Sequence, residues 1–463
     1  MSFSIPFHPN YEQLRKQAKD LHKACGKGDS SALGLLVEHH PKYSGTSPDD
    51  AVDASLSDVQ LALARAYQFS SWPQLQRSVQ EIESVEARVD DLSKQFAGAD
   101  TAGRQRLLEP VHDRKRFVDY SDGDTELSAP DARLVIANSE GYALWSKYES
   151  YVRLDPVVRD LIVAIREGEH DTVRSILAKT PEVANPRWVA GFEPNWAGDS
   201  PGTPNDSIPL FDVSEAVFNG TNRKGNEGEI AADLLAAGAD PNLDGQPLEG
   251  AVSFNCPRVV ESLIAGGVDS EAPAPGVMLA YPMLFGFTEC CEMLANAGAR
   301  LDLRFAAGLG RIDVMETFVG PAGLLPDQGL ADPYTRSVVA RGEPSVRAER
   351  TDDVVLGQAL LYACLHGRLE AAEWLLAHGA RADALVRGTD VDSTVLHRLA
   401  GPSFGETRDK TDVEQERLPI VEWVLAHGGD PTVPDAMHNA PATSWVRHAG
   451  LDQIAALMES HEP

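Results

Sequence analysis

Short segments with apolar residues at helical spacing recur along the chain, and each of them ends in glycine. Residues 369–380 and residues 418–429 are two such segments, identical at seven of twelve positions. Their apolar residues fall on one face of a helix, which predicts a half-buried amphipathic helix in each segment. The closing glycine can adopt the left-handed backbone conformation that follows a helix. The pattern therefore predicts repeated helices that end in a tight turn.

A second helical segment precedes each of these helices and also ends in glycine, as in residues 161–168 and 359–367. Small residues fill its middle, so two helices can approach each other closely. The glycines that close successive units, Gly238, Gly267 and Gly298, lie 29 and 31 residues apart. A fixed period of this size is the sequence signature of a solenoid.

These units resemble the ankyrin repeat. Leu234–Asn242 carries the family's second-helix ending, Leu-Leu-x-x-Gly-Ala-Asp-x-Asn, and Thr394–His397 is a degraded copy of its Thr-Pro-Leu-His motif. In the family the histidine of this motif has a structural role. The resemblance implies an all-α fold: an ankyrin-repeat solenoid of helix-turn-helix units with finger loops. We expect about eight divergent units in residues 154–463, interrupted by three insertions, near residues 185–206, 321–352 and 401–417.

The region before this array is duplicated in sequence. Residues 58–72 align with residues 131–145 at a constant offset of 73, without a gap. We therefore expect a duplicated α-helical N-terminal region, with one module in residues 1–83 and a second in 84–153. The first copy resembles the helical segment often found ahead of ankyrin repeats in bacterial proteins, through its elements Leu56-Ser57, Ala64–Phe69 and Ser71–Pro73. The resemblance indicates a bacterial source.

The relation of these modules to the array has two interpretations. Residues 21–41 match residues 161–181 at a constant offset of 140, as expected if the modules are ankyrin-like helix pairs that continue the solenoid. The alternative is a separate helical domain that docks on the array. The sequence leaves both open.

The charge excludes several classes of function. The 463 residues contain 41 Lys and Arg against 70 Asp and Glu, which gives a formal net charge of −29. Nucleic acids and anionic membranes both select basic surfaces, so we expect neither as a partner. The longest charge-free apolar stretch, residues 272–288, is short for a bilayer and contains three prolines. No signal peptide is visible, and the five cysteines lack CxxC spacing. These features predict a cytoplasmic protein with free buried thiols.

No pattern in the sequence points to catalysis. The GxSxG, HExxH and P-loop motifs are absent, and Gly308-Leu-Gly310 fits an inter-helix turn better than a dinucleotide loop. His378 and His427 occupy matching positions before the closing glycine, where a cation complements the carbonyl end of a helix. We therefore expect a chain that is not an enzyme and that uses no cofactor or metal.

The leading hypothesis is a non-catalytic protein–protein interaction module that binds a macromolecular, basic partner, because a solenoid presents a long binding surface. Its oligomeric state is not defined by the sequence, and a monomer is favoured. The expected finger tips lie at residues 242–245, 270–271, 300–302 and 383–384. Three aromatic residues in the first insertion serve either as partner anchors or as a hydrophobic plug. The candidate partner-binding residues are Trp188, Phe192, Trp196, Asn242, Asp244, Arg300 and Asp302.

Three alternatives remain. The chain could regulate or inhibit an enzyme or a nucleic-acid-binding protein by acidic mimicry, which predicts binding that weakens sharply with salt. It could be an enzyme whose site lies in the insertions or the N-terminal modules, which requires a pocket with convergent titratable groups. It could also be a scaffold that assembles through its own copies.

Overall fold

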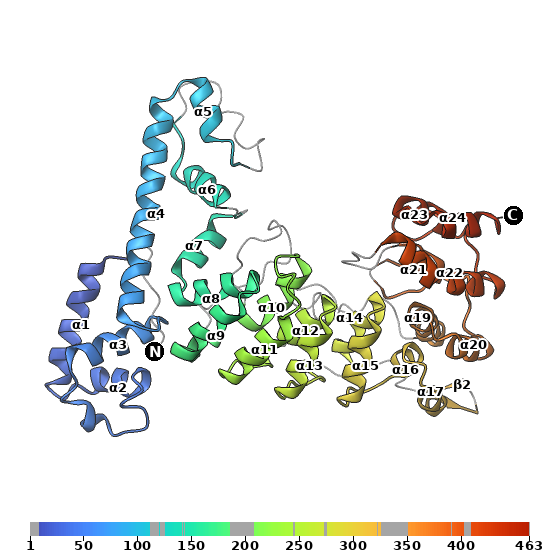
Figure 1. Cartoon of the computed structure of the whole chain (residues 1–463), viewed down its shortest axis with the longest axis horizontal. Helices are drawn as coiled ribbons and strands as arrows, with labels where there is room; N and C mark the ends of the chain where they lie inside the picture. The colour runs from blue at the N-terminus through green and yellow to red at the C-terminus, as the bar shows by residue number, and fades with distance from the viewer. Residues whose placement is uncertain are drawn as a thin grey trace. The chain divides into compact units, whose positions relative to one another are not determined.

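The computed structural model describes most of the chain, and almost all of its regular structure is helical (Figure 1). The described residues are 9–111, 120, 126–140, 142, 144–185, 208–243, 246–272, 276–321, 323–325, 351–389, 391–401 and 409–462. They form two compact units, Met1–Asp240 and Pro241–Pro463. The all-α repeat fold that the sequence predicts is confirmed. The candidate residues Trp188, Phe192, Trp196 and Asp244 lie outside the described residues.

The first unit begins with seven helices that precede the repeats. They are α1 (Tyr11–Cys25), α2 (Ser30–His39), α3 (Leu56–Ala66), α4 (Trp72–Gly98), α5 (Thr101–Leu107), α6 (Ala129–Ser139) and α7 (Trp145–Arg153), with a 3-10 turn at Pro48–Ala51. The bounds of α3 and α6 differ by 73 residues at both ends, and a tryptophan begins both α4 and α7. The same local sequence therefore begins and ends helices at the same places in both modules.

Serine caps explain where α3 and α6 begin. The Ser55 side chain accepts a hydrogen bond from the backbone nitrogen of Asp58, and Ser128 does the same for Asp131. Each aspartate in turn accepts a tyrosine hydroxyl: Asp58 binds Tyr43 at 3.0 Å and Asp131 binds Tyr120 at 2.5 Å. The serine bonds satisfy backbone donors that a helix start leaves open, and the tyrosine bonds hold the aspartates in place.

One long helix, α4 (Figure 1), contributes residues to two hydrophobic cores. Its first part, through Leu75 and Val79, packs with residues of α1 and α3. Its second part, from Ile82 to Phe96, packs with residues of α6 and α7. The module boundary expected at residues 83–84 therefore falls inside a continuous helix, close to the point where one core gives way to the next.

From α8 onward the described helices form eight consecutive pairs, the number that the sequence predicts. The pairs of the first unit are α8 (Pro156–Arg166) with α9 (His170–Lys179) and α10 (Pro209–Phe218) with α11 (Glu227–Ala236); a 3-10 turn, η3 (Pro181–Ala184), follows α9. The pairs of the second unit are α12 (Gln246–Ser253) with α13 (Pro257–Ala265), α14 (Val277–Phe285) with α15 (Thr288–Asn296), α16 (Leu303–Gly308) with α17 (Ile312–Met315), α19 (Asp352–Leu365) with α20 (Leu369–Ala377), α21 (Val395–Ala400) with α22 (Lys410–Ala426), and α23 (Ala442–Ala449) with α24 (Asp452–Glu459).

The glycines that close the second helices have the backbone conformation that the sequence predicts. Gly238, Gly267, Gly298, Gly379 and Gly428 all have positive φ, between 84° and 101°. An L-residue with a Cβ is strained in this region, and glycine is not. The same requirement recurs at each unit, so the glycine period reports the repeat directly.

In the second unit the first helices of the pairs stack in a row, each touching the next from α12 through α14, α16, α19 and α21 to α23. Part of the third expected insertion is helical, because α22 begins at Lys410 and is longer than the other second helices. Glu414 in this extension accepts hydrogen bonds from Gln453 N at 2.6 Å and Gln453 Nε2 at 3.1 Å. The extension thus helps to hold the start of α24. A two-residue hairpin pairs β1 (Val319–Gly320) with β2 (Gly323–Leu324) after α17 and its 3-10 turn, η5 (Glu316–Phe318).

Buried histidines link separate repeats of the second unit. His397 Nε2 donates to Ala440 O at 3.0 Å, and its Nδ1 accepts from Thr394 Oγ1 at 2.8 Å. The structural role expected for His397 is therefore confirmed. His366 links the end of α19 to the α14–α15 pair, two pairs earlier, because its Nε2 donates to Met283 O at 3.0 Å while Nδ1 lies 2.8 Å from Thr288 Oγ1.

We expect the stability of the second unit to fall as the pH falls from about 6.5 toward 4, partly through His366. Burial lowers the pKa of His366 to about 4, and the nearby Arg368 contributes. The unfolded chain, with a histidine pKa of about 6.5, binds the proton more tightly in this window, and the loss reaches about 2 kcal/mol by pH 5. Urea unfolding at pH 7.5 and pH 5 should show a smaller pH effect in His366→Gln than in the wild type. Equal effects would assign the pH dependence to other groups.

Candidate functional site

The expected finger tips Asn242 and Arg300 take part in a ladder between consecutive loops. In each rung a side chain of one loop accepts a hydrogen bond from a backbone nitrogen of the next repeat. The rungs join Asp240 N to Asn185 Oδ1 at 2.8 Å, Asp269 N to Asn242 Oδ1 at 2.7 Å, and Arg300 N to Glu271 Oε1 at 2.7 Å. We call these three bonds the loop ladder. Asn242 and Arg300 are exposed, but their bonds here serve the geometry of the loops.

Asp302 does not occupy the surface position expected of a finger tip. It is fully buried and caps the start of α16 through bonds from Arg304 N at 2.8 Å and Phe305 N at 3.0 Å. Its Oδ2 also lies 2.6 Å from Arg304 Nη2, and Arg304 Nη1 donates to Gln358 Oε1 at 2.6 Å. Gln358 belongs to α19, so this network joins two repeats. The structure gives Asp302 a structural role, because a buried charge needs a partner of opposite sign.

A column of exposed glutamates runs along the second helices of the second unit. Each glutamate lies six residues before a closing glycine, so it occupies the same position of its repeat. We define the glutamate column as Glu261, Glu292, Glu373 and Glu422. Glu292 pairs with Arg368 at 2.7 Å. Of these helices, α13 and α15 are in contact, and helices in contact lie about 8–10 Å apart. The α16–α17 pair comes between α15 and α20 and carries no member of the column.

Two members of the column are followed by partly exposed tryptophans that stack on histidine. The rings of Trp374 and His378 lie 3.7 Å apart, and those of Trp423 and His427 lie 4.1 Å apart. Each histidine Nδ1 also lies within hydrogen-bond distance of the tryptophan carbonyl oxygen, at 2.7 Å and 2.8 Å. These histidines therefore contact carbonyl groups at the ends of their helices, and aromatic rings are held at matching surface positions beside the glutamates.

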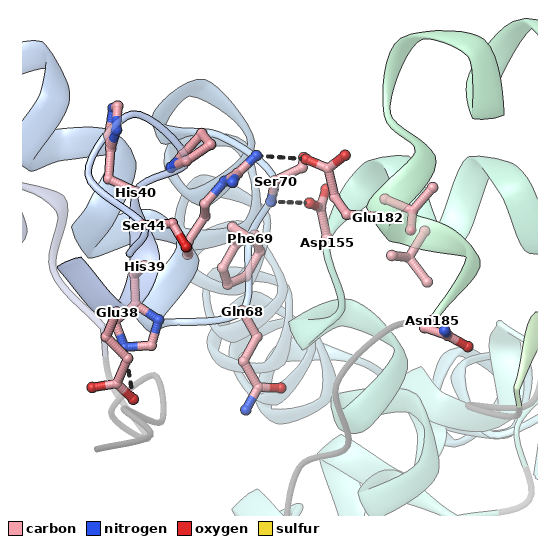
Figure 2. A pocket seen from close by; sticks show the side chains of 14 residues that line it. Glu38, His39, His40, Ser44, Gln68, Phe69, Ser70, Asp155, Glu182 and Asn185 are labelled. Carbon is pink, nitrogen blue, oxygen red and sulfur yellow. Dashed lines mark hydrogen bonds and ion pairs between the residues drawn. The ribbon is translucent and has the colours of Figure 1, made fainter. Parts of the chain in front are cut away.

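A cavity of about 460 Å³ lies in the first unit, where α2 and the end of α3 meet α8 and η3 (Figure 2). No sequence feature pointed to it. Its apolar lining includes Phe69, Val158 and Val183, which are 3%, 4% and 3% exposed. Its polar lining consists of Glu38, His39, His40, Ser44, Arg65, Gln68, Ser70, Asp155, Glu182 and Asn185, with Pro41 beside them. A volume of this size lies in the range of about 300–1,000 Å³ that small-ligand sites occupy.

Two interactions join the opposite walls of the cavity (Figure 2). Arg65 Nη2 donates to Glu182 Oε1 at 2.8 Å, and Ser70 N donates to Asp155 Oδ2 at 2.5 Å. Asp155 also caps α8 through Val157 N, at 2.9 Å. These bonds fix the N-terminal module against the first repeat, so the cavity has defined walls.

Carboxylates outnumber permanent cations in the cavity. Glu38, Asp155 and Glu182 face the single guanidinium of Arg65. Burial lowers the pKa of the neighbouring His40, although the carboxylate of Asp58 opposes this effect. His40 therefore carries less positive charge than an exposed histidine would, and the cavity has an acidic character.

Gln68 lies at a strained backbone position in the cavity wall. Its φ is 70°, at the turn after α3 where most other helix pairs have glycine. A residue with a Cβ pays roughly 1–2 kcal/mol for this conformation. Such strain is often retained where a side chain has a function, and the Gln68 amide lines the cavity.

Two features are absent from the residues that the structure describes. Among them, no group of three or more His, Cys, Asp and Glu side chains is placed to hold a metal ion. No helix in the same part of the chain has the length and apolar character to cross a membrane.

Comparison with known proteins found similarity in solved structures alone. No protein-family model and no curated protein matches the chain. The ankyrin repeat domain of human ASB11 matches at 17% sequence identity, covering 64% of this chain and 96% of that domain, with a TM-score of 0.27. The ankyrin repeat domain of Bcl-3 matches at 16% identity, covering 63% and 96%, with a TM-score of 0.26.

Proposed function

We propose that this ankyrin repeat protein is a non-catalytic protein–protein interaction module whose repeats bind a basic partner. The glutamate column supports the proposal most directly. Like charges held at one repeat position repel each other, and a partner of opposite charge relieves that repulsion. The repeat geometry sets the spacing of the carboxylates before any partner arrives.

The tryptophans beside the column supply a second kind of contact. Trp374 and Trp423 are partly exposed, and each directly follows a glutamate of the column. Tryptophan is enriched among the residues that dominate protein interfaces, where it buries a large apolar area. Acidic and aromatic groups side by side suit a partner surface that carries Lys or Arg.

A matched pair of charge-reversal variants tests this proposal. We expect Glu261→Lys with Glu373→Lys and Glu422→Lys to weaken retention of the partner in affinity capture by roughly tenfold, because three favourable charge contacts become repulsive. Capture is followed by mass spectrometry at low and high salt, and the partner found with the wild type should dissociate at high salt. The control carries the same change in net charge at exposed acids of the first unit, Glu83→Lys, Asp90→Lys and Glu109→Lys.

Two results would count against the proposal. Equal loss of capture in both variants would show that net charge, and no particular surface, controls binding. Absence of any retained protein at low salt, together with a raised melting temperature in a small-molecule screen, would indicate a ligand-binding protein instead.

We also propose a reducing location, the cytoplasm. All five cysteines are free thiols and are buried. Burial raises the pKa of Cys290 and that of Cys364 to about 12. The reactive thiolate is therefore scarce at neutral pH, and these residues behave as small apolar core groups.

A further inference from the structure

We propose that the cavity of the first unit binds a single basic side chain, lysine or arginine, presented by an extended segment of the partner. The inference rests on the proposed function, because it names the chemistry that one part of the partner offers. It concerns a different surface from the glutamate column.

The walls of the cavity match the two parts of such a side chain. Phe69, Val158 and Val183 form a buried apolar surface along which an alkyl stem can lie. The carboxylate of Glu38 is accessible, with a side chain that is 54% exposed and lies 3.6 Å from His39 Nε2, and it can meet a positive head group. Glu182, 43% exposed, is bonded to Arg65 and adds negative charge nearby. Lysine and arginine characteristically bury the stem and keep the charge at a polar rim.

The negative charge of the cavity favours a positively charged ligand. Three carboxylates against one guanidinium repel phosphate and carboxylate ligands and attract cations. Arg65 is already paired with Glu182, so it does not present an open anion site.

One polar group of the lining indicates that peptide backbone accompanies the side chain. The Gln68 amide offers both a donor and an acceptor, as a peptide unit requires. The strained backbone of Gln68 is then explained by the use of its side chain.

The test uses the full chain and three capped tripeptides, acetyl-Ala-Lys-Ala-amide, acetyl-Ala-Leu-Ala-amide and acetyl-Ala-Glu-Ala-amide. Saturation-transfer NMR titrations should show binding of the lysine peptide and much weaker signals for the other two. Glu38→Gln should weaken the lysine peptide about three- to fivefold, as loss of one accessible ion pair predicts. Glu83→Gln, an exposed acid of α4 outside the cavity, is the matched control and should leave binding unchanged.

Two further variants separate the cavity from general effects on the fold. Ser44 is an exposed lining residue, so Ser44→Trp should fill the cavity and abolish binding while the melting temperature stays unchanged. Gln68→Gly should raise the melting temperature by about 2–4 °C by relieving the strain, and it should weaken the lysine peptide.

The proposal is overturned if the leucine or glutamate peptide binds as well as the lysine peptide. It is also overturned if Ser44→Trp leaves binding intact, or if Glu38→Gln and Glu83→Gln have the same effect. If the lysine peptide does not bind but a protein is still captured in a salt-sensitive way, the cavity proposal alone is refuted. Peptide binding without any captured protein refutes the proposed function alone.

Discussion

Replacing Asp302 with alanine is expected to destabilise the second compact unit by about 3–5 kcal/mol. Asp302 is fully buried, and Arg304 is 4% exposed. Removing the carboxylate leaves the guanidinium buried without the oxygen that now lies 2.6 Å from it. It also removes the cap that α16 receives at Arg304 N and Phe305 N. Urea unfolding followed by circular dichroism measures the loss.

A double variant distinguishes buried charge from loss of packing. Asp302→Ala with Arg304→Met removes both charges, and replacing a buried pair by apolar side chains is often close to neutral. The double variant should therefore be more stable than Asp302→Ala alone. Asn242→Ala, at the exposed tip of another loop, serves as the surface control; it removes one exposed bond of the loop ladder and should cost about 1 kcal/mol. If Asp302→Ala instead weakened partner capture with unchanged unfolding, the residue would be a partner contact, as its position after a closing glycine first indicated.

Replacing Phe96 with alanine should destabilise the second N-terminal module by about 3–5 kcal/mol, because it opens a large cavity in a close-packed core. Phe96 is fully buried in α4. Its ring meets Tyr120 edge-on at 6.0 Å, and the Arg104 guanidinium lies 4.9 Å from its centroid. Hydrogen exchange should show lost protection in the part of the chain from Ile82 to Val152, while α1 and α3 keep theirs.

Two controls define what the Phe96 result means. Lys94→Ala changes a side chain of the same helix that is 77% exposed, and its effect should be within about 0.5 kcal/mol. Leu63→Ala, in the other core of this region, should instead reduce hydrogen-exchange protection in the first module. Loss of protection across both modules in either variant would show that α4 couples them into a single cooperative unit.

The repeat pattern was predictable from the sequence because its cause is local. A helix end that requires positive φ selects glycine, so Gly238 and Gly267 mark their turns without reference to the rest of the fold. The motif ending in His397 could be recognised in the sequence for the same reason, since its capping bonds join Thr394 to a residue three positions away. Local chemistry repeated at a fixed interval is visible even when the units have diverged.

The burial of Asp302 and the cavity were not predictable in this way. Asp302 follows a closing glycine, like an exposed finger tip, and its burial depends on a network that reaches Gln358 in another repeat. The cavity draws its lining from four separate stretches between residues 38 and 185. Nothing in the order of the residues brings Gln68 beside Asn185. Gln68 carried a local signal, a non-glycine residue at a turn where glycine is usual, but the sequence alone did not show its backbone angle.

The loop ladder gives the array a polarity. In every described rung the acceptor belongs to the earlier repeat and the donor to the later one. The loop with Asp240 and Asn242 and the loop with Asp269 and Glu271 therefore each carry both a donor and an acceptor. A genetic event that duplicates or deletes one of these repeats as a whole joins an acceptor to a donor again, whereas insertion or loss of part of a repeat breaks a rung. This part of the array can therefore change length in whole repeats during evolution.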